Sequence, residues 1–214
     1  MKKPANLFLL LFFLSTSLSA QRMEKFGNNG IAYSVIKTLY GIIPTKNIES
    51  HVVKDTVNYY VYLWIPDSVS EISVRLISPV PRFVSPNKGE SITEDYLDPP
   101  ATSYKKYFVP EFRLEKSINA TAAEDVFSKS LLWKIIEKSR NSSDNFAQQS
   151  EIINGALLRV FNNAKKNIRL TAGLYRIQFS AQKEKNPEGT FLLQVGIPQM
   201  IPAMKLFRSA QELQ

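Results

Sequence analysis

The sequence contains no cysteine among its 214 residues. Disulfides, a thiolate nucleophile and a thiol that could accept a lipid are therefore excluded. Its single histidine, His51, excludes a two-histidine zinc motif and leaves one imidazole for any catalytic triad. We expect His51 to be structural or solvated, since a lone histidine more often plays that part than a catalytic one.

The sequence also lacks an apolar run long enough to span a bilayer as a helix, which takes about 20 residues. Its longest run, "LFLLLFFL" (7–14), follows Lys2 and Lys3 and precedes the small polar stretch "STSLSA". This order is typical of a secretory signal peptide. We expect residues 1–20 to be the signal and residues 21–214 to form a single domain. The mature chain would be exported, to the periplasm, the outer-membrane surface or the extracellular space.

Negative charge is in short supply, because the formal net charge is +8 at pH 7. A basic surface favours acidic partners, so anionic glycans and other anionic envelope components are candidate partners. No basic run longer than two lysines and no nucleic-acid motif accompanies the charge, so we expect no nucleic-acid binding. A solvated basic surface without a partner is the alternative.

Strand patterns account for most of the remaining sequence. Residues 57–66, "VNYYVYLWIP", are apolar on both alternating faces, as expected of a central strand covered on both sides. Residues 71–78 alternate, and a further strand lies within 107–117. Residues 173–182 and 190–198 alternate about a turn that contains Pro187 and Gly189, so we expect them to form a hairpin. The fold class is mainly β, an antiparallel β-sandwich with one or two appended α-helices.

One segment predicts a helix instead. Residues 121–139 begin with Thr121 and Glu124 at the spacing of a capping box. Phe127, Leu131 and Ile135 follow at intervals of four residues and give an apolar stripe. We expect this helix to cover one face of the strand at residues 57–65.

The aromatic row Tyr60, Tyr62 and Trp64 lies on one face of that strand. Such rings could hold a sugar or a proline-rich chain, but we expect them to be core residues beneath the helix.

Two other groups are candidate ligand-binding residues. Tyr104, Lys105, Lys106 and Tyr107 combine charge with aromatic rings in an exposed stretch, although a plain strand edge would look the same. The carboxylates lie in the proline-bounded stretch 81–106 and could form a weak cation site or half of a glycosidase pair, or simply be solvated; they are Glu94, Asp95 and Asp98.

Several of these strand segments resemble those of a known family. Residues 59–79, "YYVYLWIPDSVSEISVRLISP", resemble the strand pair of the major surface lipoprotein family of Leptospira. Weaker matches follow in the same order, at "FRLEKS" (112–117), at 173–198 and at "SAQELQ" (209–214). The resemblance implies a jelly-roll-like sandwich, a surface location, no enzymatic activity and binding of host matrix proteins and calcium.

The chain departs from that family pattern in ways that remove functions. Gln21 stands where the family carries its lipidated cysteine, so no lipidation is expected there. Val109 and Pro110 replace oxygen donors of the family's calcium site, and Asp144 and Asn154 replace its acidic run and its tyrosine. A calcium ion takes about six to eight oxygen ligands, so we expect neither a metal site nor a cofactor.

These observations favour a secreted or envelope-associated, non-enzymatic binding protein that could adhere to matrix proteins or glycans. One alternative is a structural periplasmic envelope protein. Another is a polysaccharide-active enzyme that uses Glu94, Asp95 or Asp98.

Overall fold

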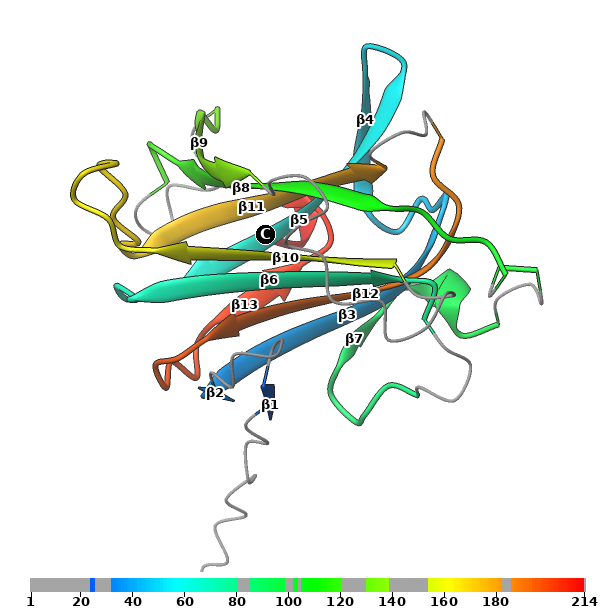
Figure 1. Cartoon of the computed structure of the whole chain (residues 1–214), viewed down its shortest axis with the longest axis horizontal. Helices are drawn as coiled ribbons and strands as arrows, with labels where there is room; N and C mark the ends of the chain where they lie inside the picture. Colours follow the sequence, from blue (N-terminus) through cyan, green and yellow to red (C-terminus); the bar gives the residue numbers. More distant parts are fainter. Residues whose placement is uncertain are drawn as a thin grey trace, which may run out of the picture.

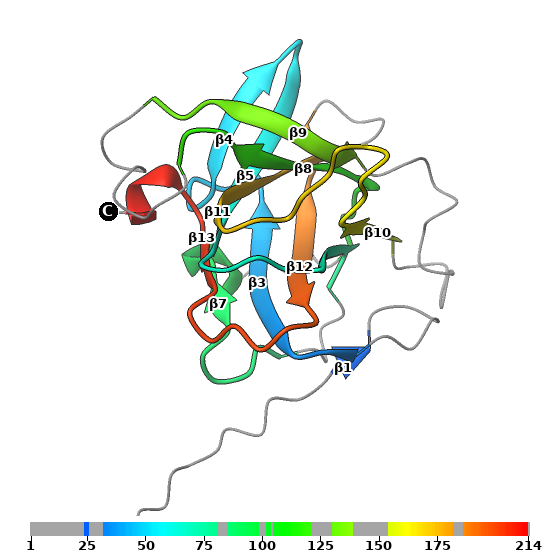
Figure 2. The same cartoon turned by 90° about the vertical axis from the view of Figure 1, so that its left-hand side faces the viewer.

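Two antiparallel-rich sheets pack face to face as a β-sandwich, which confirms the predicted fold class (Figures 1 and 2). The computed structural model describes residues 24–25, 32–80, 85–98, 102–103, 105–120, 130–138, 154–181 and 186–213. Helical structure in these residues is limited to two short 3-10 helices, η1 (Glu94–Tyr96) and η3 (Ala210–Leu213). None of the helices in this part of the chain is long and apolar enough to cross a membrane.

The first sheet has five strands, which lie in the order β10 (Asn154–Phe161), β6 (Glu71–Ser78), β12 (Gly189–Ile197), β3 (Val35–Ile43) and β7 (Ser91–Ile92). Its pairs are antiparallel except for the short parallel contact between β3 and β7. A separate two-stranded pair joins β1 (Glu24–Lys25) to β2 (Ala32–Tyr33).

The second sheet is antiparallel throughout, in the order β13 (Lys205–Phe207), β5 (Thr56–Ile65), β11 (Gly173–Ala181), β8 (Pro110–Ser117) and β9 (Trp133–Lys138). Strand β4 (Glu49–Val53) pairs with the first half of β5, beside β13 on the same edge. The β4–β5 hairpin rises beyond the body of the sandwich in Figure 1.

The apolar faces of the two sheets meet in one core. The alternating residues Ile72, Val74 and Leu76 of β6 are fully buried in it, as their spacing predicts. From the opposite sheet, the ring of Phe179 lies 5.3 Å from that of Phe191 and 5.4 Å from that of Tyr59, measured between centroids. These distances suit favourable aromatic pairs, and the three rings bridge the two layers.

The predicted hairpin of residues 173–182 and 190–198 is wrong, although both segments are strands. Strand β11 pairs with β5 and β8, whereas β12 pairs with β3 and β6 in the other sheet. Both strands carry a large apolar face, and the two faces bury more surface when stacked against each other than when placed side by side. The connection after Ala181 therefore crosses from one sheet to the other.

The predicted helix over residues 121–139 is also wrong where the structure describes it. Trp133–Lys138 form strand β9, which pairs with β8, and residues 121–129 and Ser139 lie outside the described residues. Strand β8 would otherwise present a row of unpaired backbone groups, and pairing with β9 satisfies them. Ile135 and Ile136 are β-branched and suit that strand, so tertiary pairing overrides the local helical spacing.

The aromatic row of β5 is a core feature, as predicted, but its cover differs from the expected helix. Tyr60 and Tyr62 are buried, and Trp64 is partly buried. Leu131 and Trp133 lie over the row on one side, and the C-terminal residues Phe207, Ala210 and Leu213 on the other. We call this second apolar layer, on the outer face of the second sheet, the outer aromatic cluster.

A buried polar group ties the N-terminal edge to the first sheet. Glu71 is almost fully buried and accepts hydrogen bonds from the Tyr33 hydroxyl at 2.6 Å and from Arg159 Nε at 2.7 Å. Burial, and the hydrogen bond to Glu71, raise the pKa of Tyr33, so the phenol stays a donor. The ion pair compensates the cost of burying the carboxylate.

The packing of the sandwich also requires a residue without a side chain at position 41, which is Gly41. A Cβ at this position would lie 2.4 Å from Cε1 and Cζ of Phe191, whose ring is fully buried. We predict that Gly41→Ala lowers the free energy of unfolding by about 1–3 kcal/mol, the usual cost of overpacking a core. Urea denaturation measures this loss.

The matched test is the double variant Gly41→Ala/Phe191→Leu, in which the smaller side chain leaves room for the new methyl group. Its loss should be smaller than the sum of the two single losses, because the two residues are in contact. Strict additivity would contradict the proposed contact.

Candidate ligand-binding site

An open hollow of about 410 Å³ lies between two segments that are far apart in the sequence. Lys105, Lys106 and Tyr107 line it from the segment that leads into β8, and Asn186 and Glu188 from the segment that leads into β12. Since β8 and β12 belong to different sheets, the hollow lies at a seam of the sandwich. We call it the seam hollow.

Close backbone contact holds the two segments together. Gly189 has φ +129°, and a Cβ there would lie 2.1 Å from the carbonyl oxygen of Lys106. This backbone conformation and this approach both require glycine. The amide of Thr190 also donates to the carbonyl of Ser103 at 3.4 Å.

Burial of Phe108 and nearby hydrogen bonds hold the lining segments in place. Phe108 is fully buried in the core, and its amide donates to Ser78 Oγ at 3.3 Å. The Thr190 hydroxyl accepts a hydrogen bond from the amide of Val80 at 2.9 Å. The lining side chains are therefore presented by a backbone that the core and these hydrogen bonds fix.

The lining combines charge, an aromatic ring and an amide. Lys106 forms an ion pair with Glu188, whereas Lys105 is exposed and has no ion-pair partner among the residues that the structure describes. Tyr107 is 48% exposed. One uncompensated ammonium, one half-exposed ring and the Asn186 amide can bind an anion and stack a flat ligand.

The structure brings together three residues of that predicted group, Lys105, Lys106 and Tyr107, while Tyr104 lies outside the described residues. Asn186 and Glu188 were not predicted, because nothing in the local sequence says that they meet residues 105–107. Pro187 and Gly189 predicted a turn there, but not which segment lies beside it.

The predicted acidic residues Glu94, Asp95 and Asp98 do not line the hollow. They lie in and after η1, where Glu94 and Asp98 are exposed. Tyr96 is buried between them, and its ring lies 5.5 Å from that of Tyr40. This segment packs against the outer face of the first sheet. Within the described ranges, no three His, Asp or Glu side chains gather closely enough to hold a metal ion.

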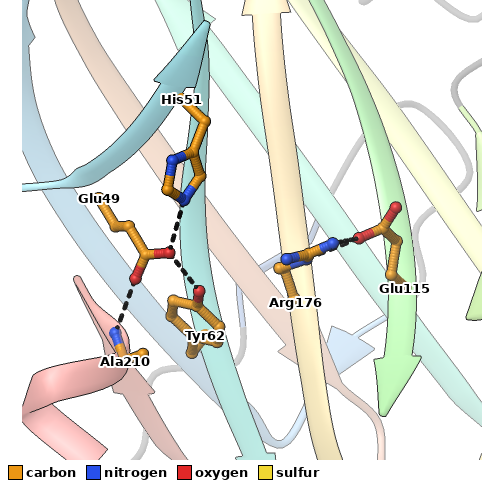
Figure 3. A network of polar contacts seen from close by, with 6 residues as sticks. All are labelled: Glu49, His51, Tyr62, Glu115, Arg176 and Ala210. Atoms are coloured by element: carbon orange, nitrogen blue, oxygen red, sulfur yellow. Dashed lines mark hydrogen bonds and ion pairs between the residues drawn. The ribbon is translucent and has the colours of Figure 1, made fainter. Parts of the chain in front are cut away.

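A second polar centre fastens the C-terminal segment to the outer aromatic cluster (Figure 3). The Glu49 carboxylate accepts hydrogen bonds from the Tyr62 hydroxyl at 2.8 Å and from the Ala210 amide at 3.0 Å. His51 Nε2 lies 3.1 Å from the same carboxylate, and the His51 side chain is 60% exposed. His51 is therefore at the rim of this centre, where it supports Glu49.

Burial alone would raise the pKa of Glu49, but the hydrogen bonds from Ala210, Tyr62 and His51 together hold the pKa below its ordinary value of 4.5. The same burial, together with the bond to Glu49, raises the pKa of Tyr62. Glu49 is thus an ionised acceptor, and Tyr62 is a neutral donor.

Beside this centre, Arg176 is held between aromatic rings and a carboxylate. Its guanidinium lies 4.2 Å from the ring centroid of Trp133 and 4.7 Å from that of Tyr60. Glu115 accepts from its Nε at 2.6 Å, and both side chains are largely buried. The two rings occupy the faces of the Arg176 guanidinium, and Glu115 occupies its donors, so we assign Arg176 a structural role.

The fold and the seam hollow define a class, a disulfide-free β-sandwich with an exposed site on a rigid frame. Comparison with protein families makes the assignment specific. Residues 28–206 match the Lipl32 family, described as a surface lipoprotein of the Spirochaetales order, and the chain belongs to that family. The match extends from before β2 to within β13. No curated protein matches the chain.

Membership of the family confirms the resemblance found in the sequence and is consistent with a protein of the cell envelope or surface. The family is one of lipoproteins, yet the sequence has no cysteine to which a thioether-linked lipid could attach.

Glu49 generates a testable prediction about the C-terminal segment. Glu49→Gln should lower the free energy of unfolding by about 1–3 kcal/mol at neutral pH, because it removes a charged acceptor of several hydrogen bonds. The amide of Ala210 should also exchange with solvent faster. Urea denaturation and hydrogen exchange measure the two effects.

The pH dependence has a definite sign. A carboxyl whose pKa is lower in the folded protein than in the unfolded chain stabilises the fold above the unfolded value, near 4.5, and loses that effect as pH falls through the folded value. The difference between wild type and Glu49→Gln should therefore shrink below about pH 4.5. Glu94→Gln, at an exposed carboxylate, is the matched control. A difference that is constant with pH would refute this account of Glu49.

Proposed function

We propose that the chain is a non-enzymatic binding protein of the cell envelope or surface, which contacts an extracellular matrix protein or a glycan. The observation that carries the proposal is the seam hollow. Its Lys105 and Tyr107 are exposed although the backbone beneath them is fixed by the core. Preorganised, exposed side chains bind a partner without paying for the ordering of a loop.

The location of the protein supports a binding function. Its family is described as a surface lipoprotein, and its N-terminal residues carry the pattern of an export signal. A protein on a cell surface meets matrix proteins and glycans directly. Without Lys2 and Lys3 of the expected signal the net charge falls from +8 to +6, which still favours those partners that are acidic.

The other arrangements of polar groups support a function without catalysis. Glu49, Tyr62, Glu115 and Arg176 satisfy one another and serve packing. The carboxylates of Glu94 and Asp98 flank a residue that is buried against the sheet. We therefore propose binding at the seam hollow, and not glycan hydrolysis by residues 94–98.

The experiment has two parts. Proteolysis of intact source cells should remove the protein, and protection until the cells are lysed would instead favour the structural periplasmic protein. The purified chain should then bind at least one component of a panel of immobilised collagen, laminin, fibronectin and extracellular glycans.

The binding must depend on the seam hollow. Lys105→Glu should weaken it about tenfold or more, because it replaces the exposed ammonium with a repelling charge. Lys88→Glu makes the same charge change at an exposed lysine elsewhere and is the matched control. Equal effects of the two substitutions, or no binding to any component, would contradict the proposed function.

A further inference from the structure

We propose that the ligand of the seam hollow is an acidic saccharide, which places a carboxylate or sulfate group against Lys105 and a sugar ring over Tyr107. This inference rests on the proposed function and adds the chemical class of the ligand. It follows from four properties of the lining, which are the position of the uncompensated charge, the exposed ring, the hydroxyl-binding groups and the open shape.

The charges place the anionic group at one end of the hollow. Among the lining residues that the structure describes, the Glu188 carboxylate neutralises Lys106, so the charge left for a ligand is that of Lys105. Lysine presents a compact ammonium rather than the planar fork of arginine, which suits a single carboxylate or sulfate. Glu188 would repel a second anion placed beside Lys106, so a densely charged ligand fits less well than one with spaced charges.

The exposed ring of Tyr107 suits a sugar. About half of this side chain is accessible, in the same segment as Lys105 and only two positions away. The face of an aromatic ring carries partial negative charge and attracts the weakly positive C–H groups on the flat side of a pyranose. A run of acidic residues, such as polyglutamate, has no comparable rigid apolar face.

Asn186 and Glu188 can bind the hydroxyl groups that surround such a ring. The amide of Asn186 both donates and accepts, and the carboxylate of Glu188 accepts. A sugar hydroxyl is both donor and acceptor, so it can bond to either residue. Glu188 would then bind the hydroxyls while its ion pair keeps Lys106 in place.

The shape of the hollow favours a chain rather than a small enclosed ligand. It is open to solvent between the two lining segments. A polysaccharide could therefore lie across it and continue on both sides. Gly189 fixes the distance between the segments through its contact with the Lys106 carbonyl, so the site is formed before the ligand arrives.

The test is calorimetric titration of the full mature chain with heparin-derived and polygalacturonate oligosaccharides. Their controls are chemically desulfated or neutral oligosaccharides of similar length and polyglutamate. We expect binding to at least one acidic oligosaccharide that is about tenfold tighter than binding to the neutral ones, and that weakens as salt is added. Lys105→Glu should weaken it about tenfold, and Lys88→Glu by less than about threefold.

The ring is tested separately from the charge. Tyr107→Ala should weaken binding about fivefold, whereas Tyr107→Phe, which keeps the ring, should lose less. The matched control is Phe161→Ala on β10, since Phe161 is 47% exposed and Tyr107 48%. Unfolding free energies of all variants show that each is folded.

Any one of four results would overturn the acidic saccharide. If neutral oligosaccharides bind as tightly, the ligand needs no anionic group. If Lys105→Glu and Lys88→Glu weaken binding equally, the ligand is attracted by the overall charge of the protein and not by the seam hollow. Polyglutamate that binds as well, without dependence on Tyr107, would make the ligand an acidic polypeptide. If acidic saccharides fail while a matrix protein binds through Lys105, this inference falls and the proposed function stands.

Discussion

The packing of two apolar sheet faces against each other is the interaction on which the rest of the molecule depends. With no cysteine in the sequence, no disulfide supplements it. The rings of Tyr59, Phe179 and Phe191 bridge the two layers, and Phe191 can lie where it does because Gly41 has no side chain. A second apolar layer on the outer face of β5, closed by the C-terminal residues, extends the same principle.

The seam hollow is a consequence of that packing. Its two lining segments lead into strands of opposite sheets, so their separation is set by how the sheets stack. Gly189 brings the segments into backbone contact, and Phe108 anchors one of them in the core. The exposed side chains of Lys105 and Tyr107 are thus carried by a segment that is held at Phe108 and at the contact with Gly189.

Much of the fold could be predicted from the sequence, because the pattern of apolar residues along a strand is a local property. It located β5, β6, β8, β11 and β12 and identified Tyr60 and Tyr62 as core residues. It could not say which strands pair, because β11 and β12 both have an alternating apolar face. That pattern is the same whether two strands pair in one sheet or lie in opposite sheets. The apolar residues of 131–136 fit a helix as well as a strand, and the open edge of β8 decided between them. Lys105 and Tyr107 were predicted from their own composition, whereas Asn186 and Glu188 join them only through the fold.

The central claim, that a close backbone contact between the sheets forms the seam hollow, is tested most directly by comparing two glycines. Gly89 and Gly189 both have positive φ, at +91° and +129°, so alanine at either position costs about 1–3 kcal/mol of backbone strain. A Cβ at Gly89 would have nothing within 4 Å, whereas one at Gly189 would lie 2.1 Å from the Lys106 carbonyl. The measurement is the free energy of unfolding of Gly189→Ala against that of Gly89→Ala. The account predicts that Gly189→Ala loses about 2 kcal/mol more, as overpacking costs, and equal losses would contradict it.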